Sequence, residues 1–248
     1  MFPLGKPITR NIMLPKSVWE LKVAVNGYKN CEGNELATQA INGRFFEILE
    51  AFDISRSRRV KVRLLEDGYI CWMESKDIEN RAIYNDSWQP NFLSKEEIKS
   101  RLPKILKWVQ IAAESKNEYL WGGTFGPNYD CSGLVQCAYA SEGIWLPRDA
   151  YQQEKFCRSI DLGGSFCEEK VEPGDLVFFG SIKKCTHVGI YQEQGLYWHS
   201  SGKLEGRNGI GVDQLHTSDK DPISTYYRSR LRGIGRVECC HNGSTLLR

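Results

Sequence analysis

The chain has 248 residues, of which 41% are hydrophobic and 26% are charged, and its formal net charge is +2. This length accommodates one large domain or two smaller ones, and the composition is that of an ordinary globular protein. Because positive and negative charges nearly balance, the composition argues against general binding to nucleic acid or to an anionic membrane. We therefore expect neither as a partner, and the sequence specifies no oligomeric state.

The sequence also lacks a recognisable export signal and a pattern of metal ligands. Its first residues contain no signal-peptide apolar run, and no apolar stretch reaches the length of about 18 residues that spans a membrane, so we expect a cytoplasmic protein. The nine cysteines are odd in number and irregularly spaced, without a C-x-x-C pair or a Cys/His cluster of zinc spacing. We expect free thiols, no metal and no other cofactor.

The first third of the chain predicts a small β-barrel. Residues 1–16 contain prolines and predict an irregular arm. Between residues 17 and 82, short apolar runs alternate with turn signals such as Asn26-Gly27 and Asp67-Gly68. Short strands at this close spacing are typical of a small barrel. We assign residues 1–85 to this domain, arm included.

A helix is expected to open the second domain. Ser94 and Glu97 have the spacing of a capping box, and an apolar stripe at helical spacing follows to residue 113. Pro103 predicts a new first turn within this segment. We assign residues 95–238 to the second domain and residues 239–248 to a tail. His241 lies in that polar tail and is assigned no role.

A candidate nucleophile stands at the start of the next helical pattern. Asp130 is a good N-cap residue, and Cys131 then falls in the first turn, where free N–H groups favour a thiolate. A buried structural cysteine is the alternative interpretation. The preceding loop favours the nucleophile, because its glycines let the chain approach a ligand closely and Tyr119 and Trp121 are placed to wall a cleft.

Two histidines are candidates for the base and its partner. His187 and His199 flank the turn signal at residues 192–195. A hairpin centred on residue 193 places them opposite each other on one face, with Val188, Ile190 and Trp198 on the other face. We expect His187 to take the Cys131 proton as an imidazolium, and His199 to orient His187 and set its tautomer.

The residues of this half of the chain resemble the NlpC-type cysteine peptidases, whose fold is papain-like. The matching motifs are Tyr119-x-Trp121-Gly122-Gly123, Asp130-Cys131-Ser132-Gly133-Leu134-Val135, Pro173-Gly174-Asp175-Leu176-Val177-Phe178-Phe179 and Thr186-His187-Val188-Gly189-Ile190-Tyr191. The resemblance covers residues 95–237 well. Residues 17–82 resemble more loosely the bacterial SH3-like domains often fused to these enzymes. The implied fold class is α+β, a papain-like catalytic domain after an SH3-like β-barrel.

The resemblance also implies a substrate. NlpC-type enzymes cleave between γ-D-glutamate and a diamino acid in peptidoglycan stem peptides, and members with a neighbouring SH3-like domain resemble enzymes that require a free N-terminal L-alanine. We therefore expect a wall-derived tripeptide or tetrapeptide and a role in recycling. The candidate substrate contacts are Asp130 for the ammonium group, Ser132 and Tyr119 beside it, Tyr69 from the SH3-like domain, Trp121 as a cleft wall, and Arg148 and Asp149, which could equally form a surface ion pair.

Other activities remain compatible with the same residues. A papain-like site also suits an amidase that acts on the glycan–peptide bond, or an acyl transferase that works through a thioester. A protein of another class, a binding module with a silent peptidase fold that only holds wall peptides, is a further alternative. The presence of all three candidate residues, Cys131, His187 and His199, argues against that last interpretation.

Tyr69 provides a first testable prediction. It follows the Asp67-Gly68 turn of the SH3-like domain, and we expect its side chain to contact the substrate. The Tyr69→Ala variant should raise KM for a stem peptide with a free amino terminus and leave kcat nearly unchanged, because a binding contact is lost while the nucleophile is intact. Steady-state kinetics on L-Ala-γ-D-Glu-diaminopimelate measure this. An unchanged KM contradicts the prediction.

Overall fold

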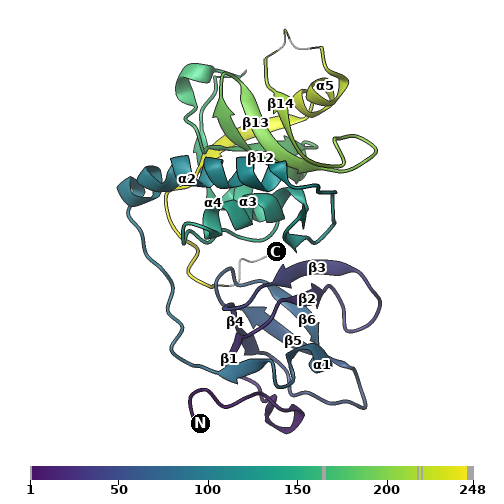
Figure 1. Cartoon of the computed structure of the whole chain (residues 1–248). Coiled ribbons are helices and arrows are strands. Elements are labelled where there is room, and N and C mark those ends of the chain that lie inside the picture. Colours follow the sequence, from purple (N-terminus) through teal and green to yellow (C-terminus); the bar gives the residue numbers. More distant parts are fainter. Residues whose placement is uncertain (1, 164–165, 217, 219, 245–248) are drawn as a thin grey trace. The chain divides into compact units, whose positions relative to one another are not determined.

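A computed structural model describes residues 2–163, 166–216, 218 and 220–244. The chain divides into two compact units, one made of Met1–Asn91 with His241–Arg248 and the other of Phe92–Cys240 (Figure 1). Each unit has its own apolar core. Among the helices that the structure describes, none combines the length and the apolar character needed to cross a bilayer.

The first unit is an antiparallel sheet in the strand order β3-β2-β6-β5-β4-β1-β7. Alternate residues of its strands point inward, as in β4, where Phe46 and Ile48 are buried. With Trp19, Val62 and Met73, they form one core. The α+β fold class and the N-terminal SH3-like sheet are confirmed. The bounds are η1 Arg10–Ile12, β1 Val18–Leu21, β2 Val25–Tyr28, β3 Leu36–Ala40, β4 Phe45–Ile48, β5 Arg59–Leu64, β6 Ile70–Glu74, α1 Ser75–Ile78 and β7 Ala82–Tyr84.

Residues 241–244 pack into the first unit and do not form the predicted tail. His241 is buried in the first unit, where it hydrogen-bonds with the backbone of Glu66 and its Nδ1 accepts from the Gly243 N–H at 3.0 Å. The same turn is held by the buried Arg44, which pairs with Glu66 and Asp67 at 3.0 Å each. Residues 241–244 therefore complete the first unit. Residues 245–248 of the predicted tail lie outside the described residues.

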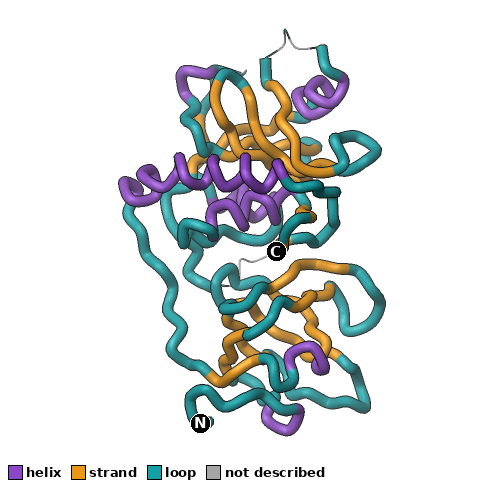
Figure 2. The backbone as a smooth tube through the Cα atoms, in the orientation of Figure 1, coloured by secondary structure: helices purple, strands orange, loops and turns teal. Residues whose placement is uncertain are grey.

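The second unit is a six-stranded antiparallel sheet in the order β10-β15-β11-β12-β13-β14. Figure 2 shows α2, α3 and α4 together along one side of the strands. Their apolar residues share one cluster with Leu176, Val188 and Ile190. Phe179, Tyr191, Tyr197 and Tyr227 belong to a second cluster on the other face. The bounds are α2 Lys95–Glu114, β8 Thr124–Phe125, β9 Asn128–Tyr129, α3 Cys131–Ala140, α4 Ala150–Phe156, β10 Arg158–Ile160, η2 Glu168–Lys170, β11 Leu176–Gly180, β12 Cys185–Glu193, β13 Leu196–Ser201, β14 Gly209–Gln214, α5 Pro222–Arg228 and β15 Leu231–Arg236.

Helix α2 starts as predicted but does not restart. The Ser94 side chain accepts from the Glu97 N–H and the Glu97 side chain accepts from the Ser94 N–H, which confirms the capping box. The new start predicted at Pro103 is wrong, since α2 continues through that residue. Ile98 and Ile105, on either side of Pro103, are buried in the same cluster, and this packing offsets the backbone hydrogen bond that proline removes.

The β12–β13 hairpin differs from the prediction in its register. The predicted turn sets Ile190 opposite Leu196, whereas the structure pairs Ile190 with Trp198, a shift of two residues. The turn consists of Gln194 and Gly195, whose φ angles of 53° and 75° are those of a two-residue type I′ turn. Because side chains alternate with a period of two, a shift of two residues leaves every side chain on its predicted face.

A pair of matched glycines tests how the end of the chain packs. Gly33 and Gly243 have φ angles of +80° and +78°, so alanine is strained at both. A Cβ at Gly33 meets nothing within 4 Å, whereas one at Gly243 lies 2.2 Å from the Leu65 carbonyl oxygen. We expect Gly33→Ala to lower the free energy of unfolding by about 1 kcal/mol and Gly243→Ala by roughly 2 kcal/mol more.

Urea unfolding followed by tryptophan fluorescence measures the difference, with limited proteolysis of the C-terminus as a second readout. Equal losses in the two variants would show that residues 241–244 do not pack against the turn.

Candidate active site

The loop before α3 is folded against the start of that helix. The short hairpin of β8 and β9 returns the chain, and the Leu120 N–H donates to the Tyr129 carbonyl at 3.3 Å. The Asp130 N–H donates to the Gly123 carbonyl at 3.2 Å. These bonds hold Asp130 in the extended conformation that an N-cap requires. Cys131 is consequently the first residue of α3, as predicted.

Asp130 is the centre of a buried network at the start of α3, next to Cys131. Its Oδ1 accepts from the Gly133 N–H at 2.7 Å, and its Oδ2 accepts from the Gly122 N–H at 2.8 Å. Arg148 donates to Oδ1 at 3.1 Å and to Oδ2 at 2.6 Å, and it also donates to the Ser132 hydroxyl at 3.0 Å. Arg148 is only 1% exposed. The alternative of a surface ion pair is therefore wrong for Arg148, which instead fixes the first turn of α3.

The surroundings of Cys131 do not favour the thiolate that its position at a helix N-terminus predicts. Burial, and after it the charge of Asp130, raise the pKa of the Cys131 thiol to about 12, although the N–H groups of Val188 and Ser132 act in the opposite direction. The position at a helix N-terminus alone does not ionise this thiol, because the cost of burying an unpaired thiolate is larger. A thiolate at Cys131 therefore needs a partner that accepts its proton.

The two predicted histidines form a hydrogen-bonded chain. His187 Nε2 lies 2.7 Å from His199 Nδ1, which confirms that the imidazoles are neighbours. His199 Nε2 in turn lies 2.5 Å from Asp213 Oδ2. His199 and the Asp213 side chain are fully buried, and burial lowers the pKa of both imidazoles, that of His187 well below its ordinary value. In His187, Nδ1 is then the ring nitrogen that remains for a proton from Cys131.

Tyr227 connects the histidines with the cysteine. Its ring stacks on His187 with centroids 4.4 Å apart, and Cys131 is among the groups that raise the Tyr227 pKa. The residue after His187, Val188, directs its N–H at the Cys131 sulfur. Cys131 and His187 thus share two neighbours, one on β12 and one on α5.

The sequence analysis missed Asp213 and Tyr227. Asp213 pairs with Tyr197 in the β13–β14 ladder, while His199 pairs with Gly211, so Asp213 is diagonal to His199 on the same face. The alternation of Ile210 and Val212 with smaller residues could have predicted the position of Asp213. It places the Asp213 side chain on the face of the strand opposite Ile210 and Val212. For Tyr227 no sequence signal exists, because α5 reaches the site only through tertiary packing.

The other predicted contacts have different environments. Tyr119 is half-buried, and burial followed by the charge of Cys131 raises its pKa. Trp121 is 66% exposed. Asp149 caps α4 through a capping box. Tyr69 belongs to the first unit and packs against its core. The substrate contacts assigned to all of these residues stay predictions.

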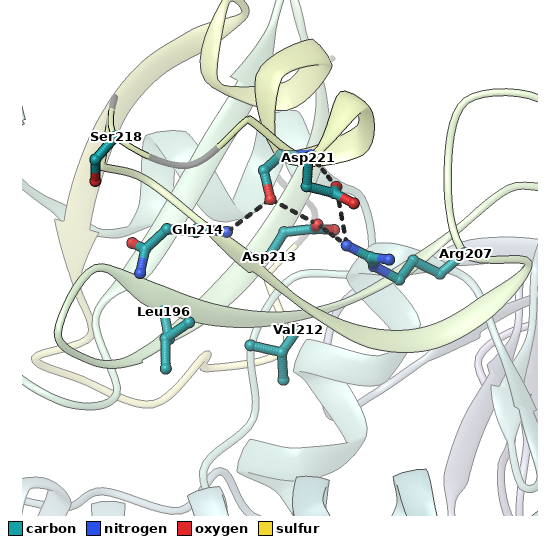
Figure 3. Close-up of a pocket in the computed structure, with 8 residues that line it drawn as sticks. Leu196, Arg207, Val212, Asp213, Gln214, Ser218 and Asp221 are labelled. Carbon is teal, nitrogen blue, oxygen red and sulfur yellow. Dashed lines mark hydrogen bonds and ion pairs between the residues drawn. The ribbon is translucent and has the colours of Figure 1, made fainter.

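A cavity of about 440 Å³ lies at the outer end of the histidine chain (Figure 3). The cavity is lined by Leu196, Arg207, Val212, Asp213, Gln214, Ser218, Asp221 and Ser224.

Within the described ranges, no group of three or more His, Cys, Asp or Glu side chains is arranged to hold a metal ion.

A cysteine at a helix start, packed against a sheet that carries a histidine pair, defines a cysteine hydrolase site of the papain-like class. Residues 116–229 match the model of the NlpC/P60 family, and residues 27–78 match that of the bacterial dipeptidyl-peptidase SH3 domain. The chain therefore contains an NlpC/P60 cysteine peptidase domain together with an SH3 domain, which confirms both resemblances.

Curated relatives are similar over the catalytic half. The bifunctional muramidase/DL-endopeptidase CwlT of Bacillus subtilis (strain 168) is 37% identical over 124 residues, 48% of this chain and 32% of that protein. The gamma-D-glutamyl-L-lysine dipeptidyl-peptidase of the same strain is 36% identical over 124 residues, 48% of this chain and 36% of that protein. The aligned region is thus about a third of the length of either relative.

A solved structure of an NlpC/P60 family protein from Bacillus cereus ATCC 10987 is 20% identical, with a TM-score of 0.44. The alignment covers 90% of this chain and 64% of that one.

The raised pKa of Cys131 predicts how its alkylation depends on His187. If His187 accepts the thiol proton in the wild type, iodoacetamide should modify Cys131 near neutral pH. In His187→Ala the thiol must ionise alone, and since its pKa is about 12, the rate at pH 7 should fall on the order of 10²-fold or more.

Mass spectrometry of the peptide that carries Cys131 measures the rate. His216→Ala is the matched control, because that imidazole contacts Glu168 at 3.2 Å and takes no part in the chain of His187 and His199. Equal rates in His187→Ala and the wild type would remove His187 from the role of base.

Proposed function

We propose that this protein is a cysteine peptidase that hydrolyses the γ-D-glutamyl–diamino acid bond of peptidoglycan stem peptides with a free N-terminal L-alanine. The observation that carries the proposal is that Cys131, at the start of α3, has its sulfur against the N–H of Val188, the residue that follows His187 in the histidine pair, whose Nε2–Nδ1 distance is 2.7 Å. The membership of residues 116–229 in the NlpC/P60 family supports it.

The first half of the reaction forms a thioester. His187 Nδ1 takes the proton from Cys131 while the sulfur attacks the γ-carbonyl carbon of D-glutamate, so the negative charge moves to the carbonyl oxygen. The Cys131 N–H stands in the first turn of α3, where it has no partner within the helix, and it is the natural donor to this oxyanion. When the tetrahedral intermediate collapses, the C–N bond breaks and His187 protonates the leaving amine.

The second half regenerates the enzyme. His187, again neutral, takes a proton from water as the water oxygen attacks the thioester carbonyl. The C–S bond then breaks, the thiolate recovers its proton from His187, and the γ-carboxylic acid of D-glutamate is released and loses its proton to water. His199 holds His187 through Nε2 in both halves, so the same nitrogen faces the sulfur throughout.

The substrate assignment rests on related names and on local charge. The relative named gamma-D-glutamyl-L-lysine dipeptidyl-peptidase and the SH3 model named for dipeptidyl-peptidases both agree with release of a dipeptide. Near the nucleophile, Asp130 and Asp149 both interact with the single cation of Arg148, and Lys184 affects Asp149 more weakly. Two carboxylates around one buried guanidinium suit a site that accepts the ammonium group of an N-terminal alanine.

A free-amine requirement would also define the biological role. In intact peptidoglycan the alanine amine is acylated by the glycan, so only peptides already released from the glycan would qualify. We therefore include the recycling of such wall peptides in the proposal.

The test is a digest of L-Ala-γ-D-Glu-diaminopimelate and of its L-lysine counterpart, followed by mass spectrometry. Each peptide is compared with its N-acetylated form and with the Cys131→Ala variant. We expect the wild type to release the diamino acid from the free-amine peptides only, with N-acetylation lowering kcat/KM on the order of 10²-fold or more, because acetylation removes the positive charge that the carboxylates of Asp130 and Asp149 attract.

Each other outcome selects an alternative. Cleavage of free and acetylated peptides alike would indicate general wall hydrolysis and remove the amine requirement. Cleavage at the glycan–peptide bond, or transfer to an added amine, would indicate the amidase or the acyl transferase. If the folded protein cleaves none of the peptides and its Cys131 does not react with an alkylating agent, the protein is a module that only binds wall peptides.

A further inference from the structure

Asp213 is the carboxylate at the far end of the histidine chain from His187, and the proposed mechanism does not use it. It stands in β14, and its side chain is fully buried beside the equally buried His199. Figure 3 shows Arg207 reaching from the cavity side between Asp213 and Asp221. We propose that Asp213, held by Arg207 and Ser224, is the positioning residue that sets the proton direction of both imidazoles and supports the charge on His187; this rests on His187 acting as the base.

The two oxygens of Asp213 are divided between two tasks. Oδ1 accepts from Arg207 at 2.6 Å and from the Ser224 hydroxyl at 3.0 Å. Oδ2 lies 2.5 Å from His199 Nε2. Because Arg207 and Ser224 supply the donors on one side, the carboxylate cannot rotate without losing them, and its other oxygen is reserved for His199.

This arrangement determines which ring nitrogen carries the proton in His199 and in His187. A carboxylate oxygen only accepts, so His199 must carry its proton on Nε2 and present the bare Nδ1 to His187. His187 must then donate from Nε2, which leaves its own Nδ1 without a proton. The single nitrogen able to take a proton from Cys131 is thus selected two hydrogen bonds away.

Asp213 also supplies an anion next to the buried imidazoles. Burial alone would raise the Asp213 pKa, but the hydrogen bonds from His199 and Arg207 outweigh it and hold that pKa below its ordinary range. Among the described residues, Tyr197 and Tyr227 also contact the imidazoles, and burial keeps both phenols protonated, while the charge of Arg207 acts against a proton on His199. When His187 takes a proton, Asp213 is the carboxylate that faces the resulting charge through His199.

The experiment compares Asp213→Asn with Asp175→Asn. Asp175 is also buried and also paired with an arginine, Arg236 at 2.8 Å, but it lies at the start of β11 and contacts neither histidine. Both variants lose a buried anion, and thermal unfolding reports the common loss of stability. Two further readouts are the alkylation rate of Cys131 between pH 5 and 10, and kcat/KM for the free-amine tripeptide over the same range.

An amide at position 213 can donate as well as accept, and it carries no charge. We expect Asp213→Asn to move the onset of Cys131 alkylation upward by about one pH unit and to lower kcat/KM on the order of 10²-fold. Asp175→Asn should leave both pH profiles where the wild type has them. Identical profiles in Asp213→Asn and Asp175→Asn, with an active wild type, would overturn the positioning role and leave the proposed function intact.

Arg207→Gln keeps the test decisive if Asp213→Asn does not fold. Arg207 is about a third exposed (34%), so its replacement is better tolerated, and it releases Asp213 without removing the carboxylate. We expect a smaller shift in the same direction. An unshifted profile in Arg207→Gln would contradict the proposal. A wild type that neither cleaves peptide nor alkylates below pH 10 would instead refute the proposed function itself.

Discussion

The cost of burying charge is the constraint on which the catalytic unit depends. Burial raises the pKa of the Cys131 thiol to about 12 and lowers the pKa of His187, so neither group ionises favourably by itself. The thiolate and the imidazolium can form together if a proton passes from Cys131 to His187, because the two opposite charges then stabilise each other. The carboxylate of Asp213 further stabilises the positive charge on His187. The hydrogen-bonded line from His187 through His199 to Asp213 provides that support without opening the site to water.

Cys131 and the two histidines are held by apolar clusters on opposite faces of the sheet. Helix α3 packs on the face that carries Val188 and Ile190, while His187 and His199 project from the other face, among Phe179, Tyr197 and Tyr227. The Val188 N–H directed at the Cys131 sulfur marks where the two faces come together. Cys131 and the histidines are therefore anchored in different apolar clusters, and the buried Arg148–Asp130 pair fixes the start of α3.

Local signals predicted the pieces of this site well. The N-cap at Asp130 places Cys131 first in α3, and strand alternation places both histidines on one face. The hairpin register was wrong by two residues because the turn chemistry of Gln194-Gly195 was not recognised, yet the face assignment survived, since two residues are one full period of a strand. Pro103 shows the converse, because tertiary burial of Ile98 and Ile105 overrode the local signal for a new first turn.

By itself, then, the sequence determined the two-part organisation, the position of Cys131 at a helix start, the histidine pair and the family, because caps, alternation and motif residues are local and each acts within a few positions. Only the tertiary structure decided what those groups experience. It paired Arg148 with Asp130 and brought Asp213 and Tyr227 to the histidines. It also returned His241 to the first unit. These contacts join residues far apart in the chain, and the burial that controls their charges arises only when the sheet and helices pack.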